Sequence, residues 1–209
     1  MFVRSRMTRE CYCVSPEDRL PAVYESMRAK GFEGLPVASE GKVVGVVTLW
    51  DVLNRLARTD NTEDYLRNTP VRDVMTDQPI TIHEDEIIEE AALLMFNNDI
   101  NILPVVNDEE QVVGILAQSD FLKIFVEVLG IRRKGTRITL RVEDRVGELA
   151  RVTEIVKNQG VSIISAVTFE SPGHHMDIVL RVATTEAKPV VDSLVANGLR
   201  VTHVSQVWA

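Results

Sequence analysis

Gly45-Val46-Val47-Thr48-Leu49-Trp50-Asp51 has a second copy in this chain, Gly114-Ile115-Leu116-Ala117-Gln118-Ser119-Asp120. In both copies a glycine follows apolar residues typical of a strand, a short turn comes next, and an aspartate stands where we expect a helix to begin. The unpaired N–H groups and the dipole of a helix N-terminus favour a phosphate, and a carboxylate there accepts hydrogen bonds from sugar hydroxyls. The simpler interpretation is that each aspartate only caps its helix.

The repeat extends well beyond this stretch. Met7-Thr8 returns as Met75-Thr76, at an offset of 75 − 7 = 68 residues, and Leu35-Pro36-Val37 returns as Leu103-Pro104-Val105 at the same offset. The glycines of the opening stretch are 114 − 45 = 69 residues apart, so one residue has been added in the turn before them. A register that is kept through a helix and strands, and slips only in a turn, indicates two copies of one folding unit.

Each copy predicts the order strand, helix, strand, strand, helix. In the first copy the helix spans about residues 20–30 and ends at Gly31, a residue that favours helix C-termini. In the second copy apolar residues at helical spacing predict a helix over residues 87–98. The remaining strands of the second copy are predicted at 80–82, 102–106 and 111–116. The polar residues 55–69 are expected to connect the two copies.

Two adjacent copies of Met-Thr, a helix, Leu-Pro-Val, Val-Val-Gly and Asp resemble a pair of CBS domains, the tandem called a Bateman module, over about residues 7–128. The resemblance implies that adenosine-containing ligands bind in clefts between the copies and that binding regulates an associated protein. Carried over residue by residue, it places the phosphate-side hydroxyl on Thr48 and the ribose-binding carboxylates on Asp51 and Asp120.

The resemblance also implies that the two clefts differ. Ala117 stands where the second copy would carry its hydroxyl, and Ser119 is the expected replacement. The base-binding positions of the family fall on Cys13 with Val14 and on Thr81 with Ile82, and threonine suits a purine edge better than cysteine does. The predicted nucleotide-binding residues are Thr48, Asp51, Thr81, Ile82, Ser119 and Asp120.

The last third of the chain predicts a second kind of domain. Its order is βαββαβ, which forms a four-stranded antiparallel sheet of the ferredoxin-like type, with both helices on one face. Asp144-x-x-Gly147-x-Leu149 at the first strand-to-helix turn resembles an ACT domain. The resemblance implies side-by-side dimerisation and an amino-acid effector near Asp144, Gly147 and Leu149, with Ser162 where the family usually has asparagine. Effector binding and plain dimerisation are both kept as interpretations.

The predicted fold class is therefore α+β, a CBS pair of two βαββα repeats followed by an ACT domain. The predicted boundaries are 1–68 and 69–130 for the repeats, 131–135 for the linker and 136–209 for the ACT domain. This order resembles the acetoin-utilisation protein B family of bacteria, which implies a link to acetoin or central carbon metabolism. The apolar helix after Asp120 is expected either to pack in the core or to form a dimer surface.

Composition excludes several classes of function. A net charge of −8, from 23 basic and 31 acidic residues, argues against nucleic-acid binding. No apolar stretch reaches the length of a membrane span, and no apolar segment follows the charged start, so we expect a cytoplasmic protein without a membrane segment. Cys11 and Cys13 supply only two metal ligands, and no nucleophile or acid–base motif accompanies the four histidines. We expect neither a catalytic nor a metal site.

The sequence thus predicts a non-catalytic sensor. AMP, ADP or ATP, with Mg²⁺ accompanying ATP, binds between the copies, and a homodimer relays binding through the ACT domain to a regulated protein that the sequence does not identify. A contrasting hypothesis is a ligand-free scaffold for dimerisation or interaction, which Ala117 and Cys13 favour. A third is an amino-acid sensor that works through the ACT domain alone.

Overall fold

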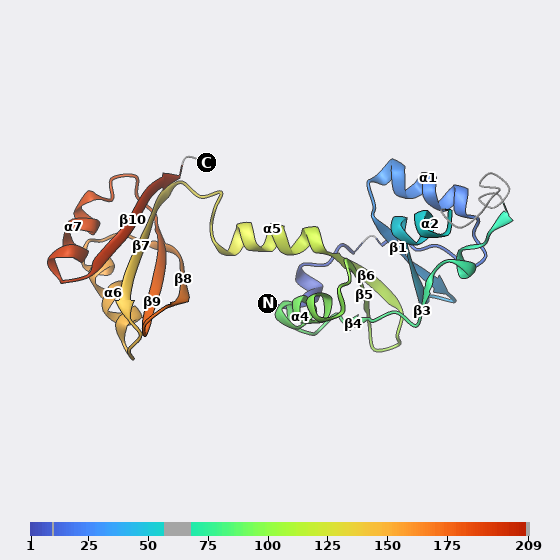
Figure 1. The fold of residues 1–209 in the computed structure, drawn as a ribbon, viewed down its shortest axis with the longest axis horizontal. Helices are drawn as coiled ribbons and strands as arrows, with labels where there is room; N and C mark the ends of the chain where they lie inside the picture. The colour runs from blue at the N-terminus through green and yellow to red at the C-terminus, as the bar shows by residue number, and fades with distance from the viewer. Residues whose placement is uncertain (10, 57–67, 208–209) are drawn as a thin grey trace. The chain divides into compact units, whose positions relative to one another are not determined.

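The structure, a computed structural model, describes residues 1–9, 11–56 and 68–207. The chain forms two compact units, Met1–Phe121 and Leu122–Ala209 (Figure 1). Most of the predicted connection over 55–69 lies outside the described residues.

The first copy is built from α1 (Leu20–Lys30), β1 (Gly34–Ser39), β2 (Lys42–Thr48) and α2 (Leu49–Leu56). As predicted, α1 ends at Gly31, whose φ of +69° suits a residue without a side chain. β1 and β2 form an antiparallel hairpin. The buried residues of α1 pack on the buried residues of this hairpin, and together they form the core of the copy.

The second copy has the same arrangement and adds a short first strand, where the first copy has only a parallel bridge between Val14 and Val37 instead of the predicted strand. Its elements are β4 (Ile82–His83), α4 (Ile88–Asn98), β5 (Ile102–Val106), β6 (Val112–Ala117) and α5 (Gln118–Val128). β4 runs parallel to β5, and β5 runs antiparallel to β6. The predicted elements are confirmed, with bounds that shift by one or two residues.

The last strand of each copy also pairs with a residue or strand at the start of the other copy. β3 (Thr76–Asp77) pairs with β2 of the first copy, through Val46 and Thr76. In the same way, Thr8 forms a bridge with Ile115 on β6 of the second copy. A residue before the predicted boundary at 68/69 therefore pairs with the second copy, and residues after it pair with the first copy.

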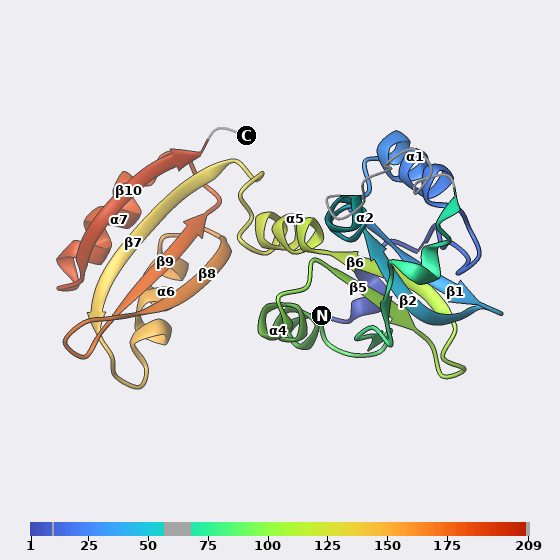
Figure 2. The same ribbon diagram turned by 45° about the vertical axis from the view of Figure 1, so that its right-hand side comes forward.

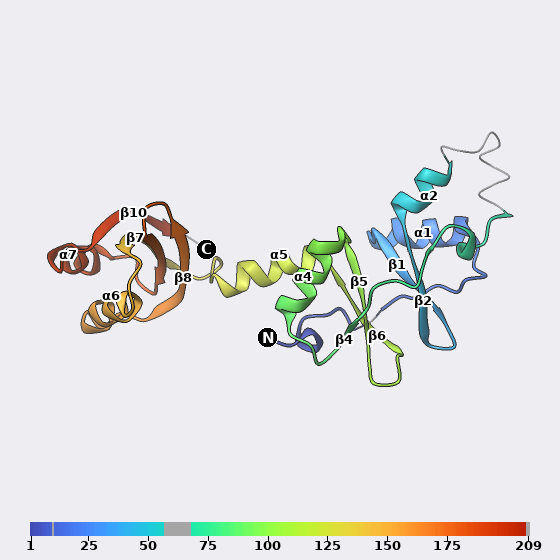
Figure 3. The ribbon, with the colours of Figure 1, turned by 60° about the horizontal axis from the view of Figure 1, so that its bottom comes forward.

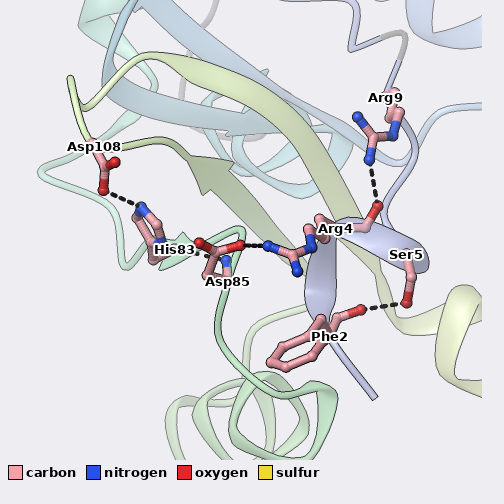
Figure 4. Close-up of polar contacts among 7 residues, drawn as sticks. All are labelled: Phe2, Arg4, Ser5, Arg9, His83, Asp85 and Asp108. Atoms are coloured by element: carbon pink, nitrogen blue, oxygen red, sulfur yellow. Dashed lines mark hydrogen bonds and ion pairs between the residues drawn. The ribbon is translucent and has the colours of Figure 1, made fainter.

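Figure 4 shows how the N-terminal segment is held on the second copy. The Val3 N–H donates to the Glu86 carbonyl over 2.8 Å, and the Arg4 N–H donates to the Glu84 carbonyl over 2.8 Å. The Arg4 guanidinium also pairs with the Asp85 carboxylate. Backbone and side-chain contacts together fasten the start of the chain to the second copy.

The exchange of segments explains why the repeat preserves both Met-Thr and the glycine of the opening stretch. A Cβ on Gly45 would lie 2.6 Å from Sδ of Met75, and a Cβ on Gly114 would lie 2.6 Å from Sδ of Met7. Both distances are shorter than side-chain carbons normally allow. Each methionine thus packs on the bare glycine backbone of the other copy.

The C-terminal unit confirms the predicted βαββαβ order. Its elements are β7 (Gly135–Glu143), α6 (Glu148–Asn158), β8 (Ile163–Ser171), β9 (His175–Val182), α7 (Lys188–Ala196) and β10 (Arg200–Val207). The strands form one antiparallel sheet in the order β10-β7-β9-β8. Both helices lie on the same face of this sheet (Figure 3).

Alternation along the strands divides the sheet into two faces. The face toward the helices carries the core, in which Ile138 and Leu140 of β7 and Ile178 and Leu180 of β9 are fully buried. β7 and β9 are the two central strands, as Figure 2 shows. The other face carries the alternate residues, many of them polar.

Arg141 and Asp177 face each other on this second face, on neighbouring strands. Arg141 Nε and Nη2 each donate to a different oxygen of Asp177 over 2.8 Å, and the Ser171 hydroxyl donates over 2.9 Å. The bond from Arg141 is the main cause that lowers the pKa of Asp177, to about 2.

This pair predicts an acid-dependent stability. Because the folded pKa is depressed below the ordinary value of about 3.9, Asp177 stabilises the domain above that value, and the contribution is lost as the pH falls through about 2. We expect Asp177→Asn to lower the melting temperature at pH 5 to 7. As the pH falls below about 4, the melting temperature of the variant should approach that of the wild type. Asp192→Asn, on the exposed surface of α7, controls for the lost charge. A melting difference that does not shrink in acid would contradict the prediction.

Candidate functional site

The start of α2 is closed by two reciprocal hydrogen bonds between Thr48 and Asp51. The Asp51 N–H donates to the Thr48 hydroxyl oxygen over 3.2 Å, while the Thr48 N–H donates to Asp51 Oδ2 over 2.8 Å. This is a capping box with aspartate in its third position. The Thr48 hydroxyl also donates to Oδ2, over 2.6 Å. The helix thus begins at Leu49, and Asp51 lies in its first turn rather than before it.

The second copy keeps only half of this arrangement. The Ala117 N–H donates to Asp120 Oδ2 over 2.9 Å, but Ala117 has no hydroxyl to return a bond. Asp120 is buried, and Ser119 beside it is exposed. The role of Ser119 as the replacement hydroxyl stays a prediction.

A cleft of about 870 Å³ opens beside the first of these helix starts. Thr48 and Asp51 line it from the first copy, and residues 78–80 and 98–102 line it from the second. Of the predicted base-binding residues, Thr81 and Ile82 are not part of this lining. Ile82 is only 4% exposed, because it packs in the core next to β5. Ile80 lies in the cleft instead.

The carboxylate of Asp51 has one oxygen that remains available to a ligand. Both hydrogen bonds from Thr48 go to Oδ2, and no described residue donates to Oδ1. An ionised carboxylate accepts on both oxygens. Asp51, one of the residues that line the cleft, therefore has an acceptor oxygen that no described residue occupies.

The charge of the lining was not foreseen from the sequence. Glu33 and Asp99 line the cleft together with Asp51, and no lysine or arginine is among the residues that line it. Asp99 follows the last residue of α4 in a left-handed conformation, with φ of +52°. Asp99 lies at this cleft because of how the two copies meet, so no local sequence signal predicts its position there.

Cys13, one of the base-binding positions that the family resemblance gives, contacts Cys11. Their Sγ atoms are 3.6 Å apart. The hydrogen bond between them is the main cause that raises the pKa of the Cys11 thiol and lowers the pKa of Cys13, so Cys13 ionises first. In the part of the chain that the structure describes, no three His, Cys, Asp or Glu side chains gather in a way that could hold a metal ion.

The predicted effector residues of the C-terminal domain surround the start of α6. Gly147 has φ of +94°, and nothing lies within 4 Å of where its Cβ would be. Asp144, Leu149 and Ser162 are all exposed. The side chain of Glu148 is buried and lies 3.4 to 3.5 Å from Arg145 and Arg151. The turn is thus open to a partner or a ligand, and the effector site stays a prediction.

Comparison with known families decides the identity of the chain. Residues 3–58 and 71–127 match the CBS domain, and these two matches cover more than half of the 209 residues. The chain belongs to the CBS-domain family. Residues 134–205 match the TTHA0829-like ACT domain, so the protein is a CBS pair followed by a C-terminal ACT domain. Among the described helices, none is both long and apolar enough to cross a bilayer.

Several relatives share this CBS pair. The uncharacterized protein MJ1225 of Methanocaldococcus jannaschii is 33% identical over 127 residues, which are 57% of this chain and 45% of the relative. The uncharacterized protein MJ1404 of the same organism is 27% identical over 215 residues, 91% of this chain and 49% of the relative. The chain thus spans about half of the length of these relatives. An inosine-5′-monophosphate dehydrogenase is 36% identical, but only over 22% of that enzyme.

Two similar CBS pairs have been solved with adenosine compounds. The pair of protein MJ0100 with 5′-methylthioadenosine and S-adenosyl-L-methionine is 28% identical, with a TM-score of 0.53, and covers 60% of this chain and 99% of that one. CBSX2 with AMP is 25% identical, with a TM-score of 0.54, and covers 61% and 97%. A Vibrio cholerae protein assigned to acetoin utilization (AcuB) has a TM-score of 0.56 at 25% identity, covering 63% and 95%.

Proposed function

We propose that this protein is a non-catalytic regulator whose first CBS cleft binds the adenosine part of a small ligand. The observation that carries the proposal is that one cleft combines the Thr48–Asp51 capping box with Ile80 of the second copy. In this proposal Asp51 Oδ1 accepts from the ribose hydroxyls, and the adenine packs on Ile80 and Pro79, which line the same cleft. The adenosine compounds held by the CBS pairs of MJ0100 and CBSX2 support this assignment.

The charge of the cleft separates two classes of adenosine ligand. AMP, ADP and ATP bring a phosphate, which the family resemblance places beside Thr48. However, the Thr48 hydroxyl already donates its proton to Asp51. The carboxylates of Glu33, Asp51 and Asp99 also line the cleft without a lysine or arginine among its lining residues. Two like charges about 8 Å apart in water repel by roughly 0.5 kcal/mol, and a divalent phosphate meets several such terms.

We therefore favour a ligand that carries adenosine without a phosphate. 5′-Methylthioadenosine is uncharged, and S-adenosylmethionine carries a sulfonium and an ammonium group that the carboxylates attract. ATP remains the second candidate only with Mg²⁺, whose charge offsets the phosphates.

The melting temperature in the presence of each ligand tests this order. A ligand at one hundred times its dissociation constant stabilises a protein by about 2.7 kcal/mol. At equal millimolar concentration and without Mg²⁺, we expect S-adenosylmethionine to raise the melting temperature more than AMP, and AMP more than ATP. Added salt should narrow the difference, because it screens the repulsion. A larger effect of AMP or ATP at low salt would favour the phosphate-binding alternative.

We also propose that the protein forms a homodimer. Phe96 on α4 is 84% exposed and Trp50 on α2 is 69% exposed, and in this proposal both side chains belong to the dimer surface. Leu122, Phe125 and Val128 of α5 are exposed as well, which favours the dimer interpretation of that helix over the core interpretation. Light scattering should give twice the chain mass of 23.4 kDa, and a single-chain mass would contradict the dimer.

The regulated protein and the pathway form a separate part of the proposal. A link to acetoin or central carbon metabolism is supported by the likeness to the Vibrio cholerae protein. Growth of a deletion strain on acetoin tests this link without involving the ligand of the cleft.

A further inference from the structure

The face of the ACT sheet opposite the helices carries a buried arginine. This arginine is not part of the adenosine cleft. Arg181 on β9 is 7% exposed. Its Nε donates to the Leu129 carbonyl over 3.1 Å, but its Nη1 is buried and bonds to no described residue. A buried donor of a charged group without a partner costs free energy, so such a group normally has an acceptor in the functional state.

A second arginine makes the arrangement still less favourable for the isolated domain. Arg137 on β7 stands directly opposite Arg181 in the strand register, and like charges in such pairs are destabilising. Burial, and after it the charge of Arg137, lowers the pKa of Arg181. Four residues further along the same strands, Arg141 faces Asp177 and is neutralised by it. The Arg137–Arg181 pair has no comparable carboxylate among the residues around it.

The two guanidinium groups line a cavity of about 200 Å³ within the C-terminal unit. A cavity of this volume is large enough for a small organic molecule. Most of the wall is apolar: Phe125, Leu129, Val167, Phe169 and Val179. Ser165 is the remaining lining residue, and its hydroxyl donates to the Leu129 carbonyl over 2.9 Å.

We propose that this cavity binds a small aliphatic carboxylate. The carboxylate accepts from Nη1 of Arg181 and from Arg137, and the short hydrocarbon chain packs on Val167, Phe169 and Val179. An α-amino acid fits poorly, because its ammonium group would approach two cations with no carboxylate in the lining. Inorganic phosphate leaves the apolar walls without contacts. The site differs from the predicted effector turn at residues 144–149.

Occupation of the cavity would also act on the end of α5. The Leu129 carbonyl is held by both Arg181 and Ser165, and Phe125 and Leu129 form part of the wall. A bound carboxylate therefore fastens residues 125–129 to the sheet. We expect slower amide hydrogen exchange in this segment when the cavity is filled.

Three compounds with one carbon skeleton test the proposal by calorimetric titration of the full chain. 3-Methylbutanoate carries the carboxylate, 3-methylbutanamide is its neutral analogue, and valine is the same acid with an added ammonium group. We expect 3-methylbutanoate to bind at least tenfold more tightly than either analogue and than inorganic phosphate. Equal affinities for all four compounds would overturn the proposal. No saturable binding of 3-methylbutanoate would also overturn it, and it would favour a carboxylate from a second copy of the chain as the group that fills the cavity.

Two variants provide the structural control. Arg137→Gln removes the repulsion, so the ligand-free protein should melt no lower than wild type while its affinity for 3-methylbutanoate falls at least tenfold. A purely structural arginine would not give this combination. Arg132→Gln removes an exposed charge of the same unit that does not line the cavity, and it should leave the affinity unchanged. Unchanged affinity in Arg137→Gln would overturn the proposal.

Discussion

Gly135→Ala is expected to destabilise the ACT domain strongly. A Cβ on Gly135 would lie well inside the van der Waals contact distance of the Val182 carbonyl oxygen, and 3.2 Å from Cδ1 of Ile164. A backbone oxygen in a central strand cannot rotate away as a side chain can, so β7 or β9 must shift at the start of β7. We expect a loss of about 3 kcal/mol or more. For a domain of this size, that lowers the melting temperature by roughly 12 to 24 °C.

Gly160→Ala is the matched control in the same domain. Gly160 has φ of +68°, but nothing lies within 4 Å of its Cβ position. The added methyl therefore introduces backbone strain of about 1–2 kcal/mol without a clash. Thermal unfolding followed by circular dichroism should rank Gly135→Ala well below Gly160→Ala. Equal melting temperatures of the two variants would contradict the prediction, because they would show that β7 and β9 can move apart at this contact at little cost in stability.

Asp51→Ala is expected to have the largest effect on ligand binding. It removes the carboxylate that we propose accepts from the ribose, and also the carboxylate half of the capping box. Hydrogen bonds to a charged group contribute about 1.5–3 kcal/mol, which corresponds to a loss of affinity of roughly tenfold to 150-fold. Calorimetric titration with S-adenosylmethionine measures this loss directly.

Asp120→Ala separates loss of the ligand contact from loss of the helix cap. Asp120 accepts the same type of bond, from the Ala117 N–H, but it does not line the first cleft. Both substitutions should cost about 1 kcal/mol of stability through the lost cap. Only Asp51→Ala should weaken binding at the first cleft. If the two variants lose affinity equally, the effect comes from the folding of the pair and not from the site.

The repeat made most of the fold predictable. The shared offset of the Met-Thr and Leu-Pro-Val motifs places two copies of one unit, and hydrophobic periodicity then locates α1 and α4 to within one residue. The same approach predicted the βαββαβ order of the ACT domain, because each strand alternates and each helix ends at or near a glycine or asparagine. These signals are local, and local propensities are what a sequence records most directly.

The features that depend on tertiary contacts were less accessible. The packing of Met7 on Gly114 joins residues more than 100 positions apart, and nothing near Met7 indicates its partner. The acidic residues Glu33 and Asp99 reach the first cleft only because the two copies meet there. Ile80 lines that cleft, whereas Ile82, two residues further on, is buried in the core. The opposition of Arg137 and Arg181 likewise needs the strand register, which the sequence alone does not specify.

Fluorescence of Trp50 tests the central claim most directly, because Trp50 lines the first cleft and is one of two tryptophans in the chain. In a Trp208→Phe variant, Trp50 is the single tryptophan reporter. Titration with S-adenosylmethionine should give a saturable change in its emission, and adding Asp51→Ala should shift the midpoint at least tenfold. An emission that stays constant while calorimetry reports binding would place the ligand elsewhere, and no binding by either method would contradict the account.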